Sequence, residues 1–241
     1  MRTLVCVKRV PMTGGKMVLT ADGQALETKH LGFTISPHEE CAVEEAVRIG
    51  GEVVVLTLGP AEAEEQLRDC MAIGADRGIL LQTSEEWDAQ STAAAIVDAI
   101  RAEEPFDLIL FGNESADAAG FQVGIRVARA LGLSVVTGLK KIEVSEGRMR
   151  CERDVGGARD VYEAPLPAVL TVLEGLNLPR YPSVPGRLRA KSKPLAVLEP
   201  ARPEQKLEKL RLVVPEGQGK RAEILENAAS VVAVMQALGV A

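Results

Sequence analysis

The fold is decided by residues 52–58, EVVVLTL, which are followed at once by Gly59-Pro60. Because this run is apolar rather than alternating, it predicts a strand that is buried on both faces, and the Gly-Pro pair predicts its end. Residues 61–73 are rich in Glu and Ala and predict a helix. A buried strand, a turn and a helix in this order are typical of a parallel sheet covered by helices.

The same alternation extends along the chain in both directions. On the N-terminal side, residues 3–7 predict the first strand, and Ser36-Pro37-His38-Glu39 predicts the capped start of a helix that runs through residues 41–49. Further strands are expected at residues 78–81, 107–111 and 167–173, further helices at 88–103 and 121–131, and a hairpin through 139–155 that turns at Glu146-Gly147. We therefore expect an α/β fold: a doubly wound, mostly parallel, Rossmann-like sheet with a β-hairpin addition.

The chain changes character after Glu174, where it becomes rich in proline and basic residues. Residues 186–221 hold ten Lys and Arg against four Asp and Glu, a local net charge of plus 6 on a chain whose net charge is minus 6. A last helix is expected at residues 222–238. We divide the chain into an α/β core, 1–185, and an extended basic arm with a helix, 186–241. Since an arm of this kind buries little surface by itself, we expect another protein to support it.

Composition excludes several functional classes. A net charge of minus 6, with one Trp, two Tyr and four Phe, argues against a nucleic-acid-binding protein. Four cysteines without a C-x-x-C spacing, and two histidines, give no zinc or iron–sulfur pattern, so we expect no metal and four reduced, buried thiols. There is neither a signal-peptide pattern nor a run of 18 apolar residues, and we expect a cytoplasmic protein without membrane insertion.

The strongest candidate for a binding site is the segment 112–124, GNESADAAGFQVG, which follows a predicted strand and opens a predicted helix. Its glycines permit close approach of a ligand, and Gln122 with the first-turn amides can donate to a phosphate. Asn113 and Asp117 can hold the loop or a sugar hydroxyl. An ordinary strand-to-helix loop would use glycine in the same way, so both interpretations stay open at this point.

Other polar residues suggest no catalytic group. There is no G-x-G-x-x-G motif after a strand, and no Ser–His–Asp or Cys–His grouping, and we expect His30 and His38 to be solvated or capping. The acid pairs Glu39-Glu40, Glu44-Glu45 and Glu64-Glu65 are expected on exposed helix faces. The alternating basic residues Arg187, Arg189, Lys191 and Lys193 are expected to form a protein-docking surface.

Residues 173–183, LEGLNLPRYPS, closely resemble the signature of the electron-transfer flavoprotein beta (small) subunit family. The resemblance covers essentially the whole chain in the family's order. It extends to residues 5–11 (VCVKRVP), Ser36-Pro37 with 42–48 (AVEEAVR), Gly59-Pro60, 72–77 (AIGADR) and the loop 112–124.

This resemblance implies a carrier subunit without catalytic side chains of its own. Family members pair with an alpha subunit that carries the redox-active FAD, and the beta subunit's own pocket typically holds AMP. Electrons would pass from acyl-CoA dehydrogenases of fatty acid beta-oxidation, or related flavoproteins, through FAD to a membrane quinone oxidoreductase or another acceptor. Carried over by position, the AMP contacts fall at Cys6, Ser36, Pro37, His38, Glu39, Leu58, Gly112, Asn113, Asp117, Gln122, Val123 and Gly124. Ser36 stands where many members have Asn.

The resemblance also implies a recognition loop at about residues 172–193, which docks on the dehydrogenases. Its expected docking residues are Leu176, Asn177, Pro179, Arg180, Tyr181, Pro182 and Val184. Val184 stands at the family's anchor leucine, so a smaller apolar side chain would be buried on docking. Asp154 aligns with a family glutamate that pairs with the alpha subunit near the flavin. The arm and the last helix would wrap the FAD-bearing domain of that partner.

Two other interpretations remain open from the sequence. A bifurcating electron-transfer flavoprotein would hold a second FAD in place of AMP. An ATP-using enzyme, or an ATP-sensing regulator that forms homodimers, would use a similar fold, although the enzyme would need a phosphate-gripping glycine loop after the first strand, and residues 8–11 (KRVP) offer none.

Overall fold

The structure is a computed structural model that describes residues 1–12, 14, 17–214 and 224–240. Its centre is a seven-stranded sheet in which every neighbouring pair of strands runs parallel. The strand order is β12 (Leu195–Leu198), β5 (Arg77–Gln82), β4 (Glu52–Gly59), β1 (Arg2–Cys6), β6 (Leu108–Gly112), β11 (Ala168–Val172) and β7 (Ser134–Leu139). The prediction of a doubly wound, parallel α/β sheet is confirmed.

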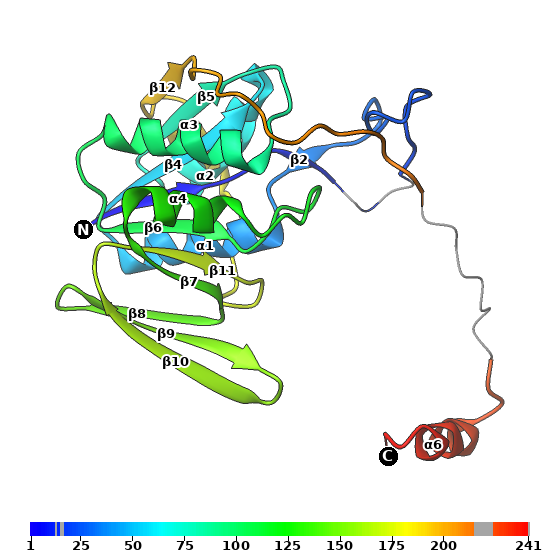
Figure 1. Ribbon diagram of the computed structural model, residues 1–241. Coiled ribbons are helices and arrows are strands. Elements are labelled where there is room, and N and C mark those ends of the chain that lie inside the picture. The colour runs from blue at the N-terminus through cyan, green and yellow to red at the C-terminus, as the bar shows by residue number, and fades with distance from the viewer. Residues whose placement is uncertain (13, 15–16, 215–223, 241) are drawn as a thin grey trace.

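Helices cover both faces of this sheet, and Figure 1 shows α3 and α4 lying side by side over one of them. That face carries α3 (Ala89–Arg101) and α4 (Val123–Leu131), and the opposite face carries α1 (Pro37–Ile49), α2 (Glu64–Ile73), which follows the 3-10 turn Ala61–Ala63, and α5 (Val184–Ala190). The strand β4 explains the arrangement, because Val53 and Val55 pack into one apolar cluster and Val54 and Leu56 into the other. A strand buried on both faces needs an apolar side chain at every position.

A second, antiparallel sheet lies beyond the β7 edge of the first (Figure 1). It contains β8 (Lys141–Ser145), β9 (Arg148–Val155) and β10 (Ala158–Pro165), and the expected hairpin turn at Glu146-Gly147 is present. Neither β10 nor β7 was expected. Strand β10 alternates exposed residues with partly buried ones, without an apolar face, and β7 is an edge strand whose first two residues are exposed. A two-stranded sheet, β2 (Val10–Pro11) with β3 (Phe33–Thr34), follows β1.

The first part of the basic segment, from residue 186 to the end of β12, packs on the α/β core. Strand β12 extends the parallel sheet beside β5. Lys193 Nζ donates to the carbonyls of Met71 and Ala75 at the end of α2, at 3.1 and 2.6 Å, and Arg187 pairs with Asp69. Arg187 and Lys193, two of the four basic residues expected in a docking surface, therefore hold the segment on α2.

The arm becomes extended after β12 and crosses the carboxyl edge of the sheet (Figure 1). Arg202 pairs with Glu85 at 2.6 Å, and the Leu212 N–H donates to the Gly23 carbonyl at 2.7 Å. The last helix, α6 (Ala228–Ala237), starts at the cap residue Asn227 and buries none of its residues. It is shorter than the expected helix, whose first two residues, 222 and 223, lie outside the described part of the chain. Within that part, no helix has both the length and the apolar character needed to cross a bilayer.

Candidate functional site

A cleft of about 390 Å³ opens at the carboxyl ends of β1, β4 and β6. In a parallel sheet this edge faces the N-termini of the following helices, where ligands of open α/β proteins bind. Nine of the twelve residues expected to contact a nucleotide line the cleft: Cys6, Glu39, Leu58, Gly112, Asn113, Asp117, Gln122, Val123 and Gly124. The other three, Ser36, Pro37 and His38, lie at the start of α1 and do not form its wall.

Ser36 and Glu39 form the expected capping box at the start of α1. The Ser36 hydroxyl accepts the Glu39 N–H at 3.3 Å, and the Glu39 carboxylate accepts the Ser36 N–H at 2.8 Å. The same hydroxyl lies 3.3 Å from the carbonyl of Glu114, to which it can donate. Ser36 therefore joins α1 to the loop that follows β6, and Pro37 occupies the first helical turn.

The carboxyl group of Glu39 is buried in the wall of the cleft. Burial raises its pKa to about 8, although hydrogen bonds from Ser36 oppose the shift. Glu39 is therefore mostly protonated at pH 7, and it places no full negative charge beside an anionic ligand. The expectation that the acid pairs are exposed is wrong for Glu39 and for Glu44, whose side chains are almost completely covered.

His38 bridges two segments outside the cleft wall. Its Nδ1 accepts the N–H of Glu174 at 2.6 Å, and its Nε2 lies 3.5 Å from the carboxylate of Glu114. The imidazole thus joins the start of the expected recognition loop to the loop after β6. This bridging role differs from the solvated and capping roles that the residues around this histidine suggested.

The loop after β6 passes close to its neighbours at two glycines. A Cβ at Gly112 would come within 2.8 Å of Glu39 Cγ, and one at Gly124 within 3.0 Å of Thr171 Cγ2. Thr171 also fixes Asn113, because its hydroxyl lies 2.7 Å from Asn113 Oδ1 while it accepts the Gly138 N–H at 3.1 Å. These contacts leave the Asn113 amide nitrogen available to a ligand.

The charges at this loop are largely balanced. Lys8 Nζ lies 2.6 Å from the carboxylate of Asp117. Burial works to raise the pKa of Asp117, but the neighbouring Lys8 outweighs it and holds the pKa below its usual value. Lys8 was not predicted as a site residue, although its position directly after the first parallel strand is a signal that could have indicated it.

The N-terminus of α4 is open toward the cleft. Gln122 precedes the helix but makes no side-chain cap, because its Oε1 accepts Arg126 Nε and Nη2 at 3.1 and 2.9 Å. The first-turn N–H groups of α4 therefore lack a side-chain acceptor, and the helix dipole makes this end electropositive. Such an arrangement is suited to a phosphate group.

The expected docking residues divide into anchors and exposed side chains. Asn177 donates to the Cys41 carbonyl at 3.0 Å and to Glu45 at 2.8 Å, and Arg180 binds Glu44, so both hold the segment on α1. Leu176 packs against the apolar core, and Pro179 and Pro182 flank the exposed stretch. Tyr181 and Val184 are 95% and 74% exposed, and Val184 is the first residue of α5.

Two further exposed side chains, Leu178 and Leu188, accompany them and were not predicted. Leu188 follows Val184 by one helical turn, a spacing that only the observed helix reveals. Asp154 lies elsewhere, near the end of β9, where it accepts Arg159 Nε at 3.2 Å.

The thiols and the acidic residues offer no second chemistry. All four cysteines are buried and unpaired, as expected, and burial raises the pKa of Cys6, Cys70 and Cys151, that of Cys151 to about 12. In the described ranges there is no group of three or more His, Cys, Asp or Glu residues able to hold a metal ion. The feature of the cleft that suits a ligand is therefore the open N-terminus of α4, which can accept a phosphate group.

Comparison with known proteins agrees with this geometry. Residues 25–203 match the family model of the electron transfer flavoprotein domain. The chain is 37% identical to the electron transfer flavoprotein subunit beta of Syntrophomonas wolfei over 89% of this chain and 86% of that protein, and 34% identical to that of Bacillus subtilis over 83% and 79%. It is also 33% identical to the caffeyl-CoA reductase-Etf complex subunit CarD of Acetobacterium woodii, over 82% and 78% of the two chains. With the signature at residues 173–183, these matches place the chain in the electron transfer flavoprotein family, as a member of its beta-subunit group.

Proposed function

We propose that this chain is the nucleotide-binding and partner-docking subunit of an electron-transfer flavoprotein, with AMP in its cleft and an FAD-bearing alpha subunit as its partner. Electrons would be carried by that flavin, which supplies the redox chemistry when bound. This chain would hold the partner, position it and recruit electron-donating dehydrogenases.

The uncapped first turn of α4 is the observation that carries the AMP proposal. Phosphate binding there would use backbone N–H groups, with Gly112 and Gly124 permitting close packing of the loop. The neutral form of Glu39 removes one source of repulsion, and Lys8 already neutralises Asp117. The apolar residues Leu58 and Val123 in the cleft wall suit the flat faces of a base and the carbon atoms of a ribose.

The end of the chain supports the proposal of an alpha-subunit partner. Helix α6 is apolar around its circumference, with Val231, Val232, Val234 and Met235 all exposed. The arm before it carries exposed Leu210, Val213 and Val214. Exposed apolar surface of this extent marks a protein interface, and the relatives are named as subunits, which agrees with assembly.

The docking segment would meet dehydrogenases through Tyr181 and Val184, which Arg180 and Asn177 present from a fixed backbone. Acyl-CoA dehydrogenases of fatty acid beta-oxidation are the proposed donors, and a membrane quinone oxidoreductase or another flavoprotein the proposed acceptor. Four buried free thiols suit the reducing cytoplasm, where we place the protein.

Coexpression with an electron-transfer flavoprotein alpha subunit tests the assembly. Gel filtration is expected to give one complex of one copy of each chain, with flavin absorbance in the same peak. A homodimer of this chain that ignores the alpha subunit would contradict the proposal and favour an ATP-sensing regulator.

A further inference from the structure

Residues 174–184, which carry the proposed docking side chains, lie along one side of helix α1. Asn177 and Arg180 bind the middle turns of that helix. The contact nearest the N-terminus of α1 comes from His38, whose Nδ1 accepts the Glu174 N–H at 2.6 Å. His38 therefore holds the start of this docking segment, just after the chain leaves β11.

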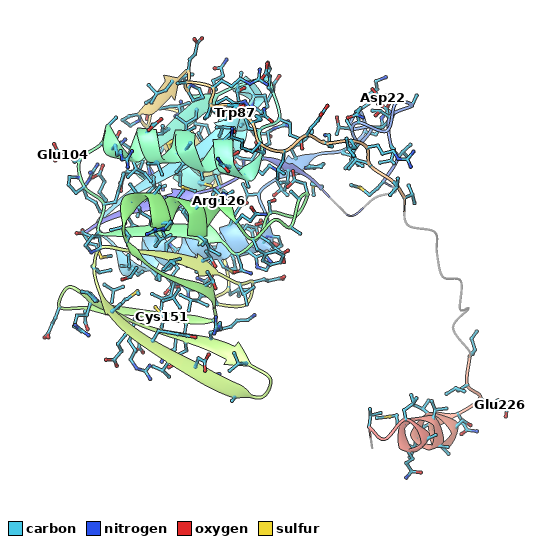
Figure 2. The ribbon with its side chains drawn as sticks, viewed as in Figure 1. Asp22, Trp87, Glu104, Arg126, Cys151 and Glu226 are labelled. Carbon is cyan, nitrogen blue, oxygen red and sulfur yellow. The ribbon has the colours of Figure 1, made fainter. Side chains whose placement is uncertain are left out.

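The other ring nitrogen of His38 faces a different element. Its Nε2 lies 3.5 Å from the carboxylate of Glu114, in the loop after β6. That loop leads to α4 on the face of the sheet opposite α1, where the side chain of Arg126 marks the helix in Figure 2. The His38 side chain is 18% exposed, so water and protons reach the ring.

The hydrogen bond from Glu174 requires a neutral imidazole. In the neutral ring one nitrogen donates and the other accepts, whereas both nitrogens donate in the protonated ring. Because Nδ1 accepts the Glu174 N–H, the proton of the neutral His38 ring lies on Nε2, on the side of Glu114. A second proton, taken from water, would add at Nδ1 and leave the Glu174 N–H without its acceptor.

Charged groups from several elements face this part of the molecule. Glu114 favours a positive ring, and so does Glu40, which lies within electrostatic range of Glu174. The N-terminus of α1 opposes it through the helix dipole, and so does the ammonium of Lys140, which donates to the Glu174 carbonyl. Glu39 is buried and mostly protonated, so it adds little charge at pH 7.

The consequence of the second proton is confined to the start of the docking segment. While the ring is neutral, both the N–H and the carbonyl of Glu174 are held, by His38 and Lys140. When the ring is charged, only the carbonyl is held. Histidine is the side chain that ordinarily changes charge between about pH 5 and 8, so this difference falls in the physiological range.

We propose that His38 is a pH-dependent positioning residue, whose neutral imidazole fixes the start of the docking segment and whose protonation releases it and weakens docking of an electron-donating dehydrogenase. The inference rests on the proposed docking function and adds to it a residue that makes docking respond to pH.

Native-state hydrogen exchange of the full chain, resolved at the Glu174 N–H by mass spectrometry, tests the release. Each rate is divided by the intrinsic exchange rate at the same pH, which gives a protection factor. In the wild type this factor is expected to be about fivefold lower at pH 5.5 than at pH 7.5, the effect of one lost hydrogen bond.

Three variants separate the titration of His38 from its packing. His38→Asn places an acceptor that does not titrate, Oδ1, near the position of Nδ1, and it should keep the protection at both pH values. His38→Phe removes the acceptor and should lower the protection at both. His30→Asn, at the only other histidine of the chain and an exposed one, is the control and should keep the wild-type pH dependence. A wild-type protection factor that does not change with pH, or a change that persists in His38→Asn, would overturn the inference.

Docking is measured on the heterodimer with the alpha subunit, as its reduction by an acyl-CoA dehydrogenase supplied with its acyl-CoA substrate. The ratio of the wild-type KM to the His38→Asn KM for the heterodimer cancels the pH dependence of the dehydrogenase itself. This ratio is expected to rise about threefold from pH 7.5 to pH 5.5, with kcat unaffected. A constant ratio beside pH-dependent exchange would show that His38 does not act on docking, while the docking function stands. If the dehydrogenase reduces neither heterodimer at either pH, the proposed docking function fails, and the inference with it.

Discussion

Arg180 binds the buried carboxylate of Glu44 with Nε at 2.8 Å and Nη2 at 2.9 Å, although 136 residues separate the two along the chain. The Arg180 N–H adds a third contact at 3.2 Å, and Arg48 binds the same carboxylate from one turn further along α1. Arg180, which was expected to contact a dehydrogenase, thus anchors the segment around residues 176–184 on helix α1. The neighbours Tyr181 and Val184 are exposed, and they are the residues proposed above to contact a partner.

Replacing Arg180 with Ala is expected to lower the free energy of unfolding by about 2 kcal/mol, because the buried Glu44 carboxylate loses its bidentate partner and keeps only Arg48 and the backbone N–H of residue 180. Arg180→Lys should recover only part of the lost stability, because an ammonium keeps the positive charge but makes no bidentate pair with the carboxylate. Urea unfolding measures the change. Arg187→Ala, which breaks the exposed pair with Asp69, is the control and should cost at most about 0.5 kcal/mol. Equal losses for the two Ala variants would contradict the anchoring role.

Replacing Glu39 with Gln should change how stability depends on pH. Since burial raises the pKa of Glu39 to about 8 in the folded protein, the wild type loses stability as pH rises from about 4.5, the usual pKa of such a group, to about 8. Gln has no proton to lose. The free energy of unfolding of the variant, relative to that of the wild type, should therefore rise by up to about 1.4 kcal/mol per pH unit in that window. Urea midpoints at pH 5, 6.5 and 8 measure this difference.

The control for Glu39 is Glu62→Gln, which removes a carboxylate at an exposed position. Its stability relative to the wild type should stay constant across the same pH range. A constant difference for Glu39→Gln as well would show that this carboxyl group is ionised in the folded protein at all three pH values.

Replacing Asp88 with Ala should loosen the arm. Partial burial works to raise the pKa of Asp88, but the N–H groups of Ser91, Lys206 and Leu207 outweigh it and hold the pKa at about 2. The ionised Asp88 carboxylate therefore stabilises the folded protein above about pH 4, and this contribution to the free energy of unfolding is lost as pH falls toward 2. Removing the carboxylate should lower the free energy of unfolding by about 1 kcal/mol through loss of the helix cap alone. Because the N–H groups of Lys206 and Leu207 also lose their acceptor, tryptic cleavage at residues 202–209 should become about fivefold faster or more.

Ser183→Ala is the matched control for Asp88, because Ser183 also caps a helix, α5, but has no contact with the arm beyond β12 among the bonds described. Cleavage at residues 202–209 should be unchanged in that variant. Equal acceleration in both would mean that general destabilisation, and not release of the arm, exposes the sites.

Replacing Val184 with Ala should weaken docking of an electron-donating dehydrogenase about fivefold, because about 1 kcal/mol of apolar burial is lost at the contact. The heterodimer and its flavin content should stay unchanged. Val197→Ala, the same substitution at an exposed valine on β12, is the control and should leave electron transfer as it was. Loss of flavin from Val184→Ala would instead make the segment part of the flavin-bearing assembly.

The sequence was most informative where one local rule decides the structure. The apolar run at β4 and the capping box at Ser36 and Glu39 each lie within a few residues, and both were predicted. The strands that the sequence did not predict depend on residues far away in the chain. Strand β12, for example, has three exposed residues out of four and is a strand because it pairs with β5. The burial of Glu44 likewise follows from Arg180, which no helical pattern around Glu44 reveals.

The candidate site shows the same division. The loop at residues 112–124 was predicted from its place after a buried strand, and the structure puts six of its expected residues in the cleft wall. Trp87, which lines the same cleft, was not predicted, because residues 83–87 after β5 carry no glycine and no motif. A search that gave equal weight to every strand end at this edge of the sheet would have included it.

The central claim, that this chain holds AMP while its partner holds FAD, is tested most directly by heating the purified heterodimer and quantifying the released small molecules by mass spectrometry. The expected result is one FAD and one AMP per pair of chains. Two FAD and no AMP would contradict the AMP assignment and identify a bifurcating flavoprotein, and the absence of any nucleotide would contradict the account of the cleft.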